Sequence, residues 1–199
     1  MKKRFKSGFT LAEVLITIAV IGVVAAITMP TMISSYQYKT VGVKLSKFAA
    51  NIESNARAYV SATKSLSTIT DVKDFVTDSF LFTSGDTNGE LEKNAEGTLK
   101  DGTKIKYNEA ATTNIDGTKY SSEKYGVPVA VFEFQPEITG LPSTAQQKFQ
   151  FVVTELGYVF PEKSDTCLDE IMKNKWITVK KDFAPETSGG KKGCYVSGT

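Results

Sequence analysis

The sequence predicts an α+β protein in which one long N-terminal helix packs on a small antiparallel β-sheet. Three observations support this prediction. Residues 9–29 are almost entirely apolar, apolar side chains then recur at helical spacing through residues 41–59, and segments rich in β-branched and aromatic residues follow from residue 98. A sheet with one apolar face has to be covered, so we expect the apolar face of the helix to lie on it.

The first apolar segment has the length and composition of a membrane-spanning helix. Residues 9–29 would form about 31 Å of helix at ~1.5 Å per residue, close to the hydrocarbon thickness of a bilayer. Four cations precede the segment: Lys2, Lys3, Arg4 and Lys6. Since positive charge is retained on the cytoplasmic side, residue 1 is expected inside and residues 31–199 outside.

Glu13 is the only ionisable side chain within this segment. A carboxylate in a membrane span is costly and usually has a partner and a function. If a protease cut the chain between Gly8 and Phe9, the new α-amino group of Phe9 would lie one helical turn from Glu13, or could face Glu13 of a neighbouring copy. Cleavage would therefore create a counter-ion for the carboxylate.

The segment Gly8-Phe9-Thr10-Leu11-Ala12-Glu13-Val14-Leu15, between a short basic leader and an apolar run that ends at Pro30, resembles the class III signal of type IV pilins and type II secretion pseudopilins. The resemblance implies a leader peptide, residues 1–8, that a prepilin peptidase removes after Gly8 before it methylates Phe9. It also implies that Glu13 pairs with the terminal amine of an adjacent subunit, and that Pro30 kinks the helix. The expected fold is then a pilin-like roll.

The resemblance also implies partners and a location. The partners would be prepilin peptidase, other copies or related pilin subunits, an inner-membrane assembly platform, and membrane lipid before assembly. The chain would be a single-pass membrane protein that later joins an extracellular or periplasmic filament. The resemblance covers only the N-terminal part of the chain, so it defines the class and not the kind of filament.

Two other interpretations of the N-terminus stay open. An ordinary secretory signal peptide would also begin with cations, and Val24-Ala25-Ala26 offers small residues near a cut, but its apolar region is normally ~7 to 15 residues long. A plain membrane anchor would contain Gly8-Phe9 by coincidence. Neither explains Gly8, Phe9 and Glu13 together.

The helix is expected to extend from Phe9 to Thr63, with its membrane half at residues 9–29. Beyond the membrane, one face at a period of 3.6 carries the apolar residues Val41, Leu45, Phe48, Ile52, Ala56 and Tyr59. Pro30 removes a backbone donor and clashes with the preceding turn, which predicts a kink. The resemblance implies that Gly22, Gly42 and Pro30 make the helix a flexible rod that can bend or partly melt when subunits pack into a filament. The alternative is that Gly and Pro occur there only because they are commoner in membrane helices.

Residues 64–199 are expected to form the exported globular domain. A short helix capped by Thr70-Asp71 would run through Asp78, followed by Phe80-Leu81-Phe82 as an anchor to the core, and Asp165 would cap another short helix. Three to five strands are expected, from the segments 99–107, 128–134, 148–154 and 158–161, with a last strand or edge segment at 176–179. Turns are expected at Asp101-Gly102, Asp116-Gly117 and Glu155-Leu156-Gly157.

The two cysteines, Cys167 and Cys194, both lie in the exported part. An even pair in an oxidising compartment predicts a disulfide that closes a loop of about 28 residues and stabilises the fold by roughly 3 to 4 kcal/mol. Two free thiols or a catalytic cysteine are the alternative. The loop resembles the disulfide-bounded region near the C-terminus of pilins.

Composition excludes several classes of function. The chain has no histidine, which removes histidine-based catalytic triads and metal sites, and no enzyme activity is expected. The formal net charge of +2 includes the leader cations, so the processed chain would be slightly acidic, and no nucleic-acid partner is expected. No cofactor or metal is expected, although residues 86–90 have the oxygen density of half a calcium loop.

The alternative function for the chain is a membrane-anchored exported binding module that does not polymerise.

Overall fold

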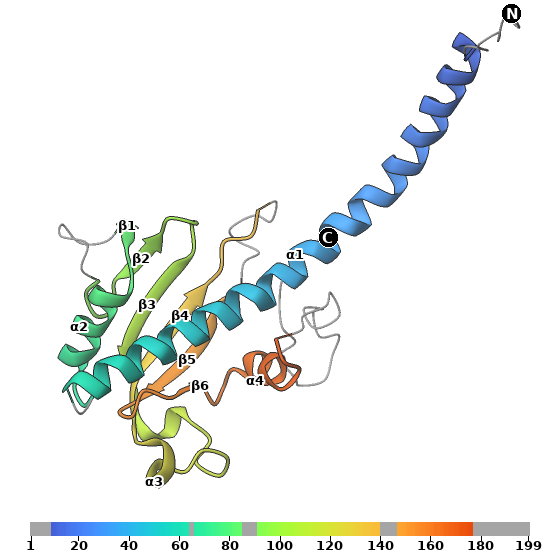
Figure 1. Cartoon of the computed structure of the whole chain (residues 1–199). Coiled ribbons are helices and arrows are strands. Elements are labelled where there is room, and N and C mark those ends of the chain that lie inside the picture. Colours follow the sequence, from blue (N-terminus) through green and yellow to red (C-terminus); the bar gives the residue numbers. More distant parts are fainter. Residues whose placement is uncertain (1–8, 64–65, 85–90, 140–146, 177–199) are drawn as a thin grey trace, which may run out of the picture. The chain divides into compact units, whose positions relative to one another are not determined.

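The computed structural model describes residues 9–63, 66–84, 91–139 and 147–176. They form a mixed α+β structure with a long N-terminal helix and a six-stranded antiparallel sheet, consistent with a pilin-like fold (Figure 1). The chain divides into two compact units, Met1–Tyr36 and Gln37–Thr199. The predicted fold class is confirmed, but the expectation of three to five strands was wrong, because the sheet has six.

The helix α1 begins at Leu11 and ends at Thr63, so it belongs to both units. In the first unit, Leu11–Pro30 is long and apolar enough to cross a membrane, and none of its residues is buried. Pro30 lies inside α1, which continues through it. The kink at Pro30 stays a prediction.

In the second unit, α1 lies against one face of the sheet (Figure 1). The predicted apolar face is confirmed: Val41, Leu45, Ile52 and Ala56 are fully buried and Tyr59 is half-buried. Phe48 is central to this contact, since its ring stacks on Phe134 at 4.0 Å between centroids and meets the edge of Phe151 at 5.3 Å. The helical period therefore determines which side of α1 meets the sheet.

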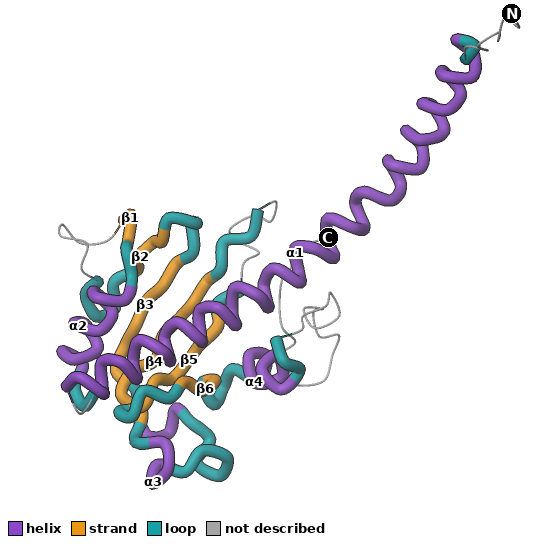
Figure 2. The backbone as a smooth tube through the Cα atoms, in the orientation of Figure 1, coloured by secondary structure: helices purple, strands orange, loops and turns teal. Residues whose placement is uncertain are grey.

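The sheet is a simple meander in which each strand pairs antiparallel with the next in the chain. Its strands are β1 (Phe82–Ser84), β2 (Glu96–Leu99), β3 (Lys104–Glu109), β4 (Pro128–Gln135), β5 (Phe149–Thr154) and β6 (Val159–Pro161). Figure 2 shows the strands in orange behind the second half of α1. Short hairpin turns join β2 to β3 and β5 to β6, whereas the other three connections between these strands are longer.

Alternation along the strands places apolar residues on both faces of the sheet. Phe132, Phe149 and Phe151 join the core under α1, whereas Val152 and Phe160, which are paired across β5 and β6, belong to a second cluster. The connection from β3 to β4 packs on this second cluster. It contains the 3-10 turn Thr112–Asn114 and the short helix α3 (Ser122–Tyr125).

Side-chain caps begin the two other helices, α2 (Ile69–Ser79) and α4 (Thr166–Lys173). The residue that caps α2 is Thr68 and not Thr70, which corrects the prediction. Thr68 Oγ1 accepts from the Asp71 nitrogen at 3.2 Å while Asp71 Oδ2 accepts from the Thr68 nitrogen at 2.8 Å, so one pair satisfies two helix-end donors. Asp165 caps α4 as predicted and accepts from the Leu168 nitrogen at 2.9 Å.

Glycines with positive φ form the two predicted hairpin turns. Gly102, with φ +80°, joins β2 to β3, and Gly157, with φ +78°, joins β5 to β6. Their nitrogens donate to the carbonyls of Leu99 at 3.0 Å and Thr154 at 2.8 Å. Residues with a Cβ rarely adopt this conformation, so the glycines permit tight turns.

The remaining predictions for this domain have mixed outcomes. The predicted turn at Asp116-Gly117 is present, since the Asp116 carbonyl accepts from the nitrogens of Lys119 and Tyr120 at 2.9 Å each. Phe80 is buried as expected, but Leu81 is 78% exposed because it points away from the core. Residues 177–179 of the expected last strand lie outside the described residues.

Candidate processing and assembly site

The candidate site lies at the start of α1, around Phe9 and Glu13. Phe9 is 89% exposed and Leu11 is 81% exposed, so the apolar side chains at the start of the helix are accessible. Phe9 lies just before the helix and Glu13 lies in its first turn. Gly8 and the leader cations lie outside the described residues.

Glu13 has a partner that the sequence analysis missed, Thr10. The Glu13 Oε2 atom accepts hydrogen bonds from the Thr10 nitrogen at 2.8 Å and from the Thr10 hydroxyl at 2.9 Å. In return, Thr10 Oγ1 accepts from the Glu13 nitrogen at 3.3 Å. This reciprocal arrangement is a capping box, and its signal was present in the sequence as a threonine three residues before a glutamate.

The capping box explains how the span tolerates a carboxylate within a single chain. Glu13 faces backbone and hydroxyl donors at the positive end of the helix dipole, where negative charge is stabilised. The charge therefore has local compensation even without a cation. In the chain as it stands, Phe9 follows Gly8, so the Phe9 nitrogen is an amide and carries no positive charge.

Other polar side chains of the span bond to its own backbone. The Thr17 hydroxyl donates to the Val14 carbonyl at 2.8 Å, and the Thr28 hydroxyl donates to the Val24 carbonyl at 3.0 Å. Polar groups in a bilayer have to be satisfied internally, and these bonds meet that requirement. Pro30 has no N–H to offer the Ala26 carbonyl one turn earlier.

The large apolar side chains of the span are exposed at the surface of the helix. Ile16, Ile21 and Ile27 are between 64% and 71% exposed, and the other large apolar side chains of the span are exposed as well. A helix that is apolar all round is stable only in lipid or among other apolar helices. The arrangement can therefore act as a membrane anchor and as a surface for helix–helix packing.

Other predicted site residues are placed apart from this segment. Cys167 is 5% exposed on α4, and Cys194 lies outside the described residues, so their disulfide stays a prediction. The calcium loop considered at residues 86–90 also lies outside them. Within the described ranges, no group of three His, Cys, Asp or Glu side chains gathers in a way that could hold a metal ion.

Fold and site together define a class: a protein with an apolar N-terminal helix suited to membrane anchoring and an α+β globular unit of pilin-like architecture. The comparison with protein families is consistent with this class. Residues 3–29 match the model of the prokaryotic N-terminal methylation motif, and this segment is a type IV pilin-like prepilin signal.

The match ends at residue 29, before the sheet begins. No curated protein and no solved structure matched the chain.

Proposed function

We propose that the chain is the precursor of a structural subunit of a type IV pilus or a type II secretion pseudopilus. Prepilin peptidase cuts it after Gly8 and methylates Phe9, and the product polymerises through its N-terminal helix. The observation that carries the proposal is the coincidence of the methylation motif at residues 3–29 with the exposed apolar helix Leu11–Pro30 and its single carboxylate.

Before assembly, the chain is held in the membrane by this helix. The leader cations keep the N-terminus in the cytoplasm, so the globular unit is exported. The anchored subunit waits beside the inner-membrane assembly platform. A disulfide between Cys167 and Cys194 would form on the exported side, where the compartment is oxidising.

Cleavage changes the charge at the start of the helix. Hydrolysis of the bond between Gly8 and Phe9 converts an amide nitrogen to an amine that is protonated at neutral pH. Glu13 of a neighbouring copy can then exchange its hydrogen bonds from Thr10 for a charge-assisted bond to this amine. Because the pair forms in an apolar surrounding, a subunit in the wrong axial register would leave an unpaired charge.

Extraction from lipid into the filament preserves the apolar surroundings of the span. Its side chains exchange contacts with lipid tails for contacts with the same segment of other copies. Gly22 has nothing within 4 Å of the position of a Cβ, and Ala19 and Ala26 are also small, so helices can approach closely along this stretch. Packing of small residues then replaces the bilayer.

The test is a variant that blocks cleavage, Gly8→Val, expressed in a host with a prepilin peptidase. A branched side chain at the cut is expected to leave more than about nine tenths of the chain as intact precursor, roughly a tenfold loss of the cleaved form. Intact-mass spectrometry of membranes measures the product, which should begin at Phe9 and carry one methyl group in the wild type.

Gly22→Val is the matched control, since it makes the same change inside the span and away from the cut. It should be cleaved like the wild type. A wild-type product that begins at any residue other than Phe9 would refute the processing step. A product that is cut and methylated but never found in filaments would favour an anchored binding module instead.

A further inference from the structure

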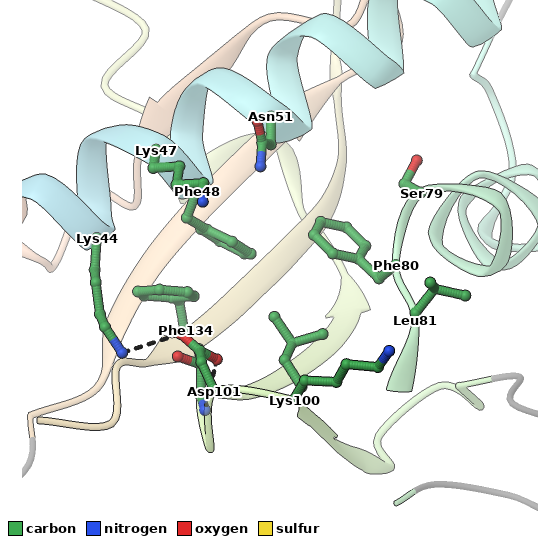
Figure 3. Close-up of a pocket in the computed structure, with 12 residues that line it drawn as sticks. Lys44, Lys47, Phe48, Asn51, Ser79, Phe80, Leu81, Lys100, Asp101 and Phe134 are labelled. Carbon is green, nitrogen blue, oxygen red and sulfur yellow. Dashed lines mark hydrogen bonds and ion pairs between the residues drawn. The ribbon is translucent and has the colours of Figure 1, made fainter. Parts of the chain in front are cut away.

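A second site lies in the globular unit, in a cavity of about 420 Å³. Four parts of the chain line it: the second half of α1, the end of α2 with the residues after it, the hairpin between β2 and β3, and β4 (Figure 3). Binding sites for small molecules typically measure about 300 to 1,000 Å³ and combine an apolar lining with a few polar groups. The cavity has this size, and its lining has this composition.

Aromatic rings form the apolar part of the lining. Phe48, Phe80 and Phe134 lie at the centre of the cavity in Figure 3, each contributed by a different element. Phe48 lies 6.0 Å from Phe80 and 4.0 Å from Phe134 between ring centroids. Leu81, which is 78% exposed, and Leu99 complete this surface above the buried rings.

Lysines give the cavity a net positive charge. Lys44, Lys47 and Lys100 line it together with a single acidic residue, Asp101. Lys44 is already engaged, since its Nζ atom donates to Asp101 Oδ2 at 3.0 Å and to the Glu137 carbonyl at 2.6 Å. Burial acts to raise the pKa of Asp101, but the hydrogen bonds from Lys44 and Thr103 hold it below its ordinary value.

The other two lysines are available to a ligand. No described residue forms an ion pair or hydrogen bond with the side chain of Lys47 or Lys100. They come from α1 and from the β2–β3 hairpin, so their cations approach the cavity from two sides (Figure 3). Unpaired cations beside an apolar surface suit a ligand that has both an anionic and an apolar part.

Thr103 is a further polar residue of the lining, and it is only 2% exposed. Its nitrogen donates to Asp101 Oδ1 at 3.1 Å, and its side chain also interacts with Asp101. Thr103 therefore helps to hold Asp101 in place, and Lys47 and Lys100 are the groups of the lining that can bind an anion.

We propose that this cavity binds a small organic anion in which a carboxylate is joined to an aromatic group. The ring packs against Leu81 and Leu99, next to the cluster of three Phe rings. Lys47 and Lys100 hold the carboxylate. The site lies wholly within the globular unit, so its function does not depend on processing or polymerisation.

The experiment titrates the full chain, in nanodiscs of phosphatidylcholine, with 2-naphthoate. Methyl NMR signals of Leu81 and Leu99 report binding, and empty nanodiscs define the share of ligand that enters lipid. A ligand of this size is expected to bind with a Kd between about 0.1 and 1 mM. The double variant K47Q/K100Q should bind about threefold to tenfold more weakly, because two ion pairs are lost.

Two controls make the result specific. The double variant K163Q/K175Q removes the same charge at exposed lysines outside the cavity and should bind like the wild type. The neutral analogue 2-naphthamide should bind the wild type at least about threefold more weakly than 2-naphthoate.

Three outcomes would overturn the proposal. They are no saturable shift at Leu81 and Leu99 with 2-naphthoate, equal losses in the two double variants, and equal affinities for the acid and the amide. Thermal unfolding of each variant, compared with the wild type, verifies that a loss of binding does not come from a loss of fold.

Discussion

Glu13 is held by hydrogen bonds within its own chain. Thr10 supplies a backbone donor at 2.8 Å and a hydroxyl donor at 2.9 Å, so the charge of the carboxylate has local compensation within the apolar helix. A charge-assisted bond to an amine is stronger than a bond to a neutral donor. In the proposed function, the terminal amine of another copy therefore replaces Thr10 as the hydrogen-bond donor to Glu13.

From this exchange we predict that Glu13→Ala separates processing from assembly. The variant should be cut and methylated, because the cleavage site is unchanged, but its incorporation into filaments should fall by about tenfold or more, since an unpaired terminal amine would be buried. Immunoblots of sheared filaments against membranes measure the ratio. Thr17→Ala is the control, and filaments at the wild-type level from Glu13→Ala would contradict the pairing.

At the scale of elements, the turn between β5 and β6 packs directly on the backbone of α1. A Cβ on Gly157 would lie 2.8 Å from the Arg57 nitrogen and 2.9 Å from the Ala56 carbonyl carbon. The same turn accepts a hydrogen bond at the Glu155 carbonyl from the Leu66 nitrogen at 3.2 Å. One glycine thus allows the sheet and the helix to approach as closely as the core requires.

Gly157→Ala should consequently destabilise the globular unit by roughly 1 to 3 kcal/mol, since it combines a positive φ with a backbone clash. Thermal unfolding of the full chain in detergent should show a midpoint lower by several degrees, at roughly 2–4 °C per kcal/mol. Gly117→Ala is the matched control, because nothing lies within 4 Å of its Cβ position. Equal midpoints for the two variants would show that the turn does not need glycine.

At the scale of the whole molecule, the two compact units differ in whether their apolar residues are buried. In the first unit the span has no buried residue, whereas the buried hydrophobic residues all lie between Val41 and Ile171 in the second. The second unit therefore contains the entire core of the described residues, including the half of α1 that covers the sheet. The first exposes its apolar side chains, and a helix that is apolar all round is stable only in lipid or among other apolar helices.

Removal of residues 1–36 should leave a folded, soluble protein. The fragment 37–199, exported to an oxidising compartment, is expected to be monomeric and to unfold cooperatively, because no core contact is lost. Size-exclusion chromatography and circular dichroism measure this. Ending the deletion at residue 48 instead removes Val41, Leu45 and Phe48 and should abolish the fold; equal behaviour of both fragments would contradict the division.

Local patterns predicted much of this architecture. The spacing of apolar residues identified the buried face of α1, and the glycines at 102 and 157 identified two hairpins. The Thr10 and Glu13 pair was equally local and could have been recognised as a capping box. β1 was missed because a strand of three residues that pairs with a register shift has almost no periodic signal.

The sequence by itself determined the anchor, the cleavage motif, the amphipathic helix and most of the strands, because each depends on residues within a few turns of one another. Only the tertiary structure decided which side chains meet across the chain. The cavity unites Lys47, Phe80 and Lys100 from three parts of the chain that are far apart in the sequence. Such contacts arise from how a helix and a sheet pack together, which no local pattern encodes.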